Sequence, residues 1–157
     1  MQTLHYSPEG IHTAVGVIAV VVNAERQVLL VLSKDRGWEP PMGFLEPNES
    51  PIPALHREVL EESGYTVKVT RLTGVYHCIH NQMPIISLCF LCEVGELVSS
   101  AIEESVAVRW ADKEKLKDFI TYQPHLLRLT DALQGEHVFF RNYQIRPFLV
   151  SNSWILQ

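Results

Sequence analysis

The sequence lacks the features that mark several broad classes of protein. Its net charge is −5, so there is no basic excess to hold a nucleic-acid backbone or an anionic membrane. Three cysteines are too few for a disulfide scaffold in a chain of 157 residues. The longest apolar run, residues 14–22, is shorter than the roughly 20 residues of a membrane span. The first 13 residues contain no Lys or Arg, so no secretory signal is expected. We therefore expect a cytoplasmic protein whose partner is neither a nucleic-acid polymer nor a membrane.

The length and composition predict one ordinary globular domain. The chain is 46% hydrophobic and 20% charged, and it is too short for two comfortable domains. We expect a single domain over residues 1–157 with its core in about 13–133. The aromatic-rich tail, residues 135–157, has an uncertain role: it could cover the core or serve as a homodimer contact.

Strand patterns occur along most of the chain. Residues 14–22 are apolar at every position and rich in β-branched side chains, which predicts a strand buried on both faces, with 28–34 as its partner. Residues 65–79 predict a long strand with a bulge near Leu72, where the alternation breaks parity. Residues 85–94 predict a central strand. Together with the helices below, these strands predict a mixed α/β sandwich.

Helix signals follow a predicted loop. Residues 35–43 are rich in Gly and Pro and predict that loop. Ser50 can cap a helix, Pro51 suits its first position, and Gly64 suits the position just past its end. Further on, a short strand is predicted at 106–110 and helices at 112–119 and 124–134.

The predicted helix carries three carboxylates, Glu58, Glu61 and Glu62, on one face. At about 100° per residue they share an arc of roughly 100°, beside the apolar face of Leu55 and Val59. A solvated acidic face would cost only a few tenths of a kcal/mol per pair. Partly buried charges about 5 Å apart would instead repel by roughly 3 kcal/mol at an effective dielectric of 20 and would need cations. Both interpretations fit these three residues alone.

The surrounding pattern favours the second interpretation. In order, it contains Gly43, five residues, Glu49, seven residues, Arg57-Glu58, Val59, one residue, Glu61-Glu62, one residue, Gly64 and Tyr65. This resembles the complete signature of the Nudix hydrolases, G-x5-E-x7-R-E-U-x-E-E-x-G-U, where U is a bulky apolar residue. We call residues 43–65 the box. The resemblance implies a Nudix-like α/β/α sandwich with a mixed sheet and a loop-helix-loop at the catalytic box.

The resemblance also implies metal-dependent hydrolysis of a pyrophosphate bond in a nucleoside diphosphate derivative. The expected cofactor is Mg²⁺, with Mn²⁺ as an alternative, and the expected partner is a small-molecule nucleotide. Nucleoside triphosphates, nucleotide sugars and ADP-ribose-type substrates remain open. The alternative is a non-catalytic nucleotide-sensing or regulatory module of the same fold.

Residue roles follow from matching box positions. The resemblance implies metal ligation by Glu58, Glu62 and Glu61, support of the metal shell by Glu49, and a backbone carbonyl ligand from Met42. Met42 stands where relatives usually have a second glycine. The glycines of the box, Gly43 and Gly64, are expected at structural turns.

The catalytic assignments include residues inside and outside the box. Glu62 and Glu61 are the expected carboxylates of catalysis, and Arg57 is expected to hold a box glutamate in place. Some relatives use a base in the loop before the last core strand, where Glu104 and Glu103 stand as the alternative.

Substrate contacts are predicted in two loops. Arg36 could meet a phosphate and Trp38 could stack on a base, although they could equally be a surface charge and a packing residue. The segment 122–125 could also line a base pocket.

Overall fold

The computed structural model describes residues 12–98 and 105–156. The strands are β1 (Ala14–Val22), β2 (Val28–Ser33), β3 (Gly37–Glu39), β4 (Met42–Phe44), β5 (Tyr65–His80), β6 (Met83–Leu97), β7 (Val108–Ala111), β8 (Val138–Gln144) and β9 (Leu149–Leu156). The helices are α1 (Pro51–Ser63), α2 (Leu116–Phe119) and α3 (Gln123–Leu133), with a 3₁₀ turn η1 (Lys113–Lys115). Within the described ranges, no helix has the length and apolar character needed to cross a membrane.

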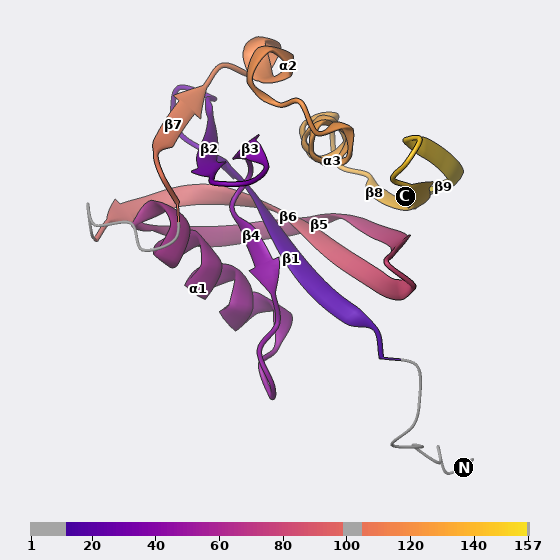
Figure 1. Cartoon of the computed structure of the whole chain (residues 1–157). Helices are drawn as coiled ribbons and strands as arrows, with labels where there is room; N and C mark the ends of the chain where they lie inside the picture. Colours follow the sequence, from indigo (N-terminus) through magenta and orange to yellow (C-terminus); the bar gives the residue numbers. More distant parts are fainter. Residues whose placement is uncertain (1–11, 99–104, 157) are drawn as a thin grey trace.

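The strands form one mixed sheet with the order β3-β2-β1-β6-β5-β8-β9, and β4 and β7 pair with β1 and β2. β1 is parallel to β6 but antiparallel to β2 and β4. In Figure 1, α1 lies on one side of this sheet, and α2 and α3 lie on the other. The predicted α/β/α sandwich with a mixed sheet is therefore confirmed.

The burial of β1 on both faces explains its uninterrupted apolar sequence. Ile18 and Val20 belong to the core beneath α3, with Leu129. Val17, Ala19 and Val21 belong to the core beneath α1, whose contribution is Ala54, Leu55 and Val59. Because successive strand residues point to opposite faces, a strand between two helical layers needs apolar residues at both parities.

The ends of α1 follow the sequence signals, with one correction. Gly64 has φ 76° and donates its N–H to the Leu60 carbonyl at 2.8 Å, as a C-terminal glycine does. Pro51 is the first helical residue. Ser50 takes the N-cap position, but its side chain makes no capping hydrogen bond, so that expected bond is wrong.

The long hairpin β5–β6 contains the predicted irregularity. Its register shifts between Leu72 and Gly74, among other places, which confirms the bulge near Leu72. Asn81 and Gln82 form its turn with φ of 48° and 65°, the left-handed values that a two-residue hairpin turn requires.

Two local predictions differ from the structure, and one segment without a prediction is now placed. Residues 35–43, predicted as loop, include β3 and the first two residues of β4, which form because β2 and β1 offer them hydrogen-bonding edges. α3 begins at Gln123, one residue before the expected proline. The tail supplies β8, parallel to β5, and then β9 along β8.

Candidate active site

A cavity of about 490 Å³ is bordered by residues from both helical layers. Its α1 wall consists of Met42, Gly43, Glu58 and Glu62. Its α3 wall consists of Tyr122, His125, Arg128 and Tyr143. Further lining comes from the sheet and adjoining loops, including Gly16, Ile18, Arg36, Cys78, Ile85 and Ser87.

The α1 wall holds two of the box carboxylates in buried positions. Glu58 and Glu62 lie one helical turn apart, and they are 6% and 7% exposed. The Met42 N–H donates to Glu62 Oε2 at 2.9 Å, which fixes that carboxylate against β4. Helical spacing and β4 pairing together bring these residues to the cavity.

Gly43 is required by the close approach of Glu58. A Cβ at position 43 would lie 2.0 Å from Cδ and Oε1 of Glu58, far inside contact distance. Gly43 therefore leaves space for the Glu58 carboxylate, whereas Gly64 allows the positive φ at the end of α1.

Arg57 connects the carboxylates that border the helix. Its Nε and Nη2 donate to the two oxygens of Glu49 at 2.9 and 2.8 Å. Its Nη1 donates to Glu58 at 2.8 Å and to Glu61 at 3.1 Å, and Nη2 also reaches the Phe44 carbonyl at 3.1 Å. The i, i+4 pair with Glu61 is thus one part of a larger network.

This network keeps Glu49 ionised. The hydrogen bonds from Arg57, with a further one from the Glu46 N–H, lower the pKa of Glu49 to about 2. The same pairing raises the pKa of Arg57, so the guanidinium stays charged. Glu61 belongs to this network and is not among the residues that line the cavity.

The α1 wall fits a hard divalent cation in its chemistry, since carboxylate oxygens are the usual protein ligands of Mg²⁺. Within residues 12–98 and 105–156, however, no group of three or more His, Cys, Asp or Glu side chains is arranged to hold a metal ion. The pairs that Arg57 makes with Glu58 and Glu61 provide a physical reason. Ligation by several box glutamates would require these pairs to rearrange.

The exposed Arg36 and the buried Glu39 form a link between the cavity and α3. Arg36 donates from Nε and Nη2 to both oxygens of Glu39, each at 2.8 Å. His125 Nε2 lies 3.0 Å from the same carboxylate. Burial acts to raise the pKa of Glu39, but the hydrogen bonds from His125 and Arg36 outweigh it and lower the pKa. Glu39 is fully buried and is thus a charged anchor.

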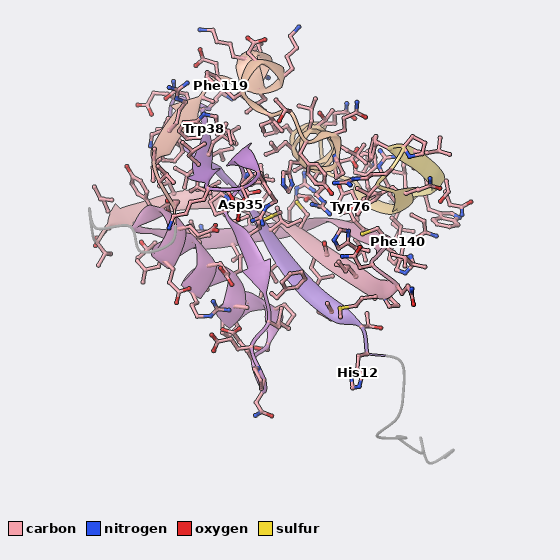
Figure 2. The ribbon with its side chains drawn as sticks, viewed as in Figure 1. His12, Asp35, Trp38, Tyr76, Phe119 and Phe140 are labelled. Atoms are coloured by element: carbon pink, nitrogen blue, oxygen red, sulfur yellow. The ribbon has the colours of Figure 1, made fainter. Side chains whose placement is uncertain are left out.

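Other predicted site residues lie elsewhere. Trp38 packs against the core, and the Arg109 guanidinium lies 4.9 Å from its ring centre and 4.5 Å from that of Phe119. Figure 2 shows Trp38 close to Phe119, away from Tyr76. The structure does not bring Trp38 to the cavity. Glu103 and Glu104 lie outside the described residues.

Sequence reasoning missed Glu39, Arg128 and Tyr143. A signal existed for Arg128, because His125, Leu129 and Ala132 mark the buried face of α3, and Arg128 stands on that face. Glu39 and Tyr143 carry no comparable local signal, since only the folded sheet brings them to α3.

Comparison with known proteins agrees with this geometry. The sequence model of the NUDIX domain family matches residues 12–133 of this chain. This chain belongs to the NUDIX family. A MutT-like protein of Streptomyces ambofaciens is 37% identical over 123 residues, which cover 78% of each chain. A putative 8-oxo-dGTP diphosphatase of Bacillus subtilis is 42% identical over 62 residues, 39% of this chain and 42% of that protein.

Solved structures show the same fold. A NUDIX hydrolase from Nitrosomonas europaea superposes with a TM-score of 0.69 at 23% identity, over 89% of this chain and 82% of that one. An ADP-ribose pyrophosphatase from Streptococcus suis gives 0.65 at 20% identity, over 83% and 99%. With its complete box, the chain is a Nudix pyrophosphohydrolase.

Proposed function

We propose that this Nudix enzyme hydrolyses the pyrophosphate bond of a nucleoside diphosphate derivative with the help of Mg²⁺, or of Mn²⁺ in its place. The observation that carries the proposal is the position of Glu58 and Glu62, two buried carboxylates of a complete box on the wall of one cavity. Such carboxylates suit a site that takes up a cation together with phosphate groups.

The box residues take distinct roles in this reaction. Glu58 and Glu62 would hold the ion, with Glu61, Glu49 and the Met42 carbonyl as further or indirect ligands. A bound divalent ion would neutralise the pyrophosphate oxygens and lower the pKa of a water molecule. Arg57 orients Glu49, Glu58 and Glu61 through its hydrogen bonds.

The bond change requires a base. The water oxygen forms a bond to one phosphorus while the bond from that phosphorus to the bridging oxygen breaks. The proton of the water passes to a carboxylate, for which we propose Glu62. Glu103 or Glu104 is the alternative, and a pH–rate profile for each Gln variant distinguishes the three residues.

The substrate belongs to the group of nucleoside triphosphates, nucleotide sugars and ADP-ribose-type compounds. The similar proteins described above, which include a putative 8-oxo-dGTP diphosphatase and an ADP-ribose pyrophosphatase, support this range. We propose that Arg36, which borders the cavity, contacts a phosphate group through the guanidinium edge that Glu39 does not use.

A nucleotide panel tests the proposal. The protein is incubated with each substrate class and Mg²⁺, Mn²⁺ or EDTA, and release of phosphate, pyrophosphate or nucleoside monophosphate is measured. We expect turnover of at least one class with either metal and none with EDTA. Nucleotide binding without turnover under any metal condition would instead support the non-catalytic sensing module.

We also propose a cytoplasmic location and a homodimer contact through β9. The three cysteines are free, which suits a reducing compartment. β9 exposes Leu149, Trp154, Ile155 and Leu156, carries no charge and ends the sheet path, so a second copy could add there. Sedimentation of Trp154→Ser against the unaltered chain tests the contact, and equal molecular masses would exclude it.

The tail is better tested by this substitution than by truncation near Gln134. Phe139 and Tyr143 of β8 are buried, and Tyr143 borders the cavity. Removing residues 135–157 would therefore disturb the core and the site together. These contacts support our proposal that the tail belongs to a single domain with the rest of the chain.

A further inference from the structure

Arg128 is a buried cation on the α3 wall of the cavity. The residue is 5% exposed, and its guanidinium carbon lies 5.5 Å from the ring centres of both Tyr76 and Tyr143. Nη1 lies 3.3 Å from His125 Nδ1, and Nη2 donates to the Tyr143 hydroxyl. Its Nε is buried and has no hydrogen-bond partner. Among the residues that the structure describes, the hydrogen-bond partners of Arg128 are thus one histidine and one tyrosine.

The histidine brings no negative charge to Arg128. A guanidinium can only donate, so Nδ1 of His125 accepts and the ring proton is on Nε2, which donates to Glu39. Burial lowers the pKa of His125, more than the hydrogen bond with Glu39 raises it, which is consistent with a neutral ring. His125 therefore relays a hydrogen bond between Arg128 and Glu39 while remaining uncharged.

The nearby carboxylates are matched to other arginines. Glu39 is held by Arg36 Nε and Nη2, each at 2.8 Å, and Asp131 is held by Arg141 Nε and Nη2, each at 2.6 Å. Among the described residues, no carboxylate oxygen lies within 4.0 Å of Arg128. Two arginines thus have one carboxylate each, and the third faces the cavity without one.

An unpaired buried charge is costly, and an anion supplied by a ligand would offset that cost. We propose that Arg128 binds an oxyanion, phosphate or carboxylate, on the part of the substrate that lies beyond the pyrophosphate to be cleaved. The charge favours an anion over a neutral carbonyl of a nucleobase. This inference deepens the proposed function and rests on it for the position of the pyrophosphate at the α1 wall.

The first experiment measures anion binding without turnover. Inorganic phosphate is titrated into the full chain in EDTA, and the binding constant is taken from calorimetry. We expect Arg128→Met to weaken binding about tenfold or more, the range for loss of one charge-assisted hydrogen bond. Arg109→Met is the matched control, since Arg109 also lies between two aromatic rings but does not border the cavity. Equal binding by Arg128→Met and the unaltered chain would overturn the proposal.

Arg128→Lys is a second variant, which keeps the proposal testable if Arg128→Met does not fold. Lysine keeps the charge but loses the planar fork, so an intermediate phosphate affinity is expected. Circular dichroism of both variants checks their folding. Phosphate affinity in a folded Arg128→Lys identical to that of the unaltered chain, together with unchanged affinity in Arg128→Met, would leave Arg128 a purely structural residue.

The second experiment uses substrates that differ by one anion. UDP-glucuronate is compared with UDP-glucose for a carboxylate, and ADP-ribose 2′-phosphate with ADP-ribose for a phosphate. In at least one pair we expect the anionic member to be preferred about tenfold or more in kcat/KM, mainly through KM. Arg128→Met should abolish that preference. Equal losses on both members of each pair would contradict anion recognition.

Failure of the proposed function gives a different result. If no panel substrate is hydrolysed but phosphate binding still depends on Arg128, the anion site stands and the pyrophosphohydrolase reaction is wrong. If hydrolysis proceeds and Arg128→Met changes neither phosphate binding nor substrate preference, the reaction stands and the anion site is wrong.

Discussion

Helices α1 and α3 both supply charged residues to the cavity, but they obtain their partners in different ways. The carboxylates paired with Arg57 on α1 lie within eight residues of it. On α3, His125 meets Glu39 across 86 residues, and Asp131 meets Tyr76 across 55. The network of α1 is local, whereas that of α3 depends on the completed fold.

The two networks also differ in burial, and this predicts different consequences. The side chains of the Arg57–Glu49 pair are 24% and 14% exposed, whereas those of His125 and Glu39 are 2% and 0% exposed. Solvent screens partly exposed pairs, so they contribute little to stability. Removing one partner from a buried pair leaves an uncompensated charge. Substitutions in the partly exposed Arg57 network should therefore cost little stability, whereas removing the buried partners His125 or Asp131 on α3 should cost much more.

The largest expected effect is that of Asp131→Asn. Asp131 accepts from Tyr76 at 2.9 Å and holds Arg141 of β8, so the variant weakens two contacts between α3 and the sheet. We expect the free energy of unfolding to fall by about 3 kcal/mol, measured by urea denaturation. Asp112→Asn, at an exposed pair with Lys115, should lower the free energy of unfolding far less. Similar losses for the two variants would remove the distinction between buried and exposed networks.

Glu62→Gln should lower activity strongly and change stability little. Turnover at saturating Mg²⁺ should fall by at least about a hundredfold, the low end for loss of a catalytic base, while the melting temperature stays near its original value. Glu93→Gln makes the same chemical change at an exposed glutamate of β6 and should leave turnover unchanged. Glu62→Gln with undiminished turnover would refute the role we propose for Glu62.

Gly43→Ala should have a smaller effect on activity. The new Cβ would displace the Glu58 carboxylate, whose flexible end can move without unfolding the loop. We expect turnover to fall about tenfold and stability by about 1 kcal/mol, near the lower limit for overpacking. Gly95→Ala is the control, since its Cβ would lie 2.3 Å from the Thr66 hydroxyl, at a residue that does not border the cavity. Equal loss of turnover in both variants would contradict a specific effect on Glu58.

The difference between local contacts on α1 and long-range contacts on α3 explains which parts of the structure the sequence could predict. The box has a fixed local spacing, and helical geometry alone places Glu58 and Glu62 on one face. β1 was predictable because burial on both faces leaves an uninterrupted apolar run. Glu39 was not predictable as a partner of His125, because its position depends on β3 pairing with β2 far from α3 in sequence. β8 and β9 were missed for the same reason, since their pairing with β5 and with each other leaves no strong periodic pattern.

The smallest expected effect concerns Glu49, on the more exposed network. Its pKa is about 2, against an ordinary value of 4.5. A lowered pKa contributes stability that is fully present above pH 4.5 and is lost as the pH falls towards 2. Arg57→Met should raise the pKa of Glu49 most of the way to 4.5, and the Glu46 N–H, which donates at 2.9 Å, should account for the remainder.

Carboxyl NMR titration of the unaltered chain and Arg57→Met measures this change directly, with Arg109→Met as the charge-matched control. Because Glu49 is held from outside the cavity wall, its titration should leave Glu62 and the α3 network unaffected. A Glu49 pKa that remains near 2 without Arg57 would show that the loop backbone, rather than the arginine, holds this carboxylate. The ionisation of Glu49 would then depend on the Glu46 N–H, three residues away, and would still be a local property of the chain.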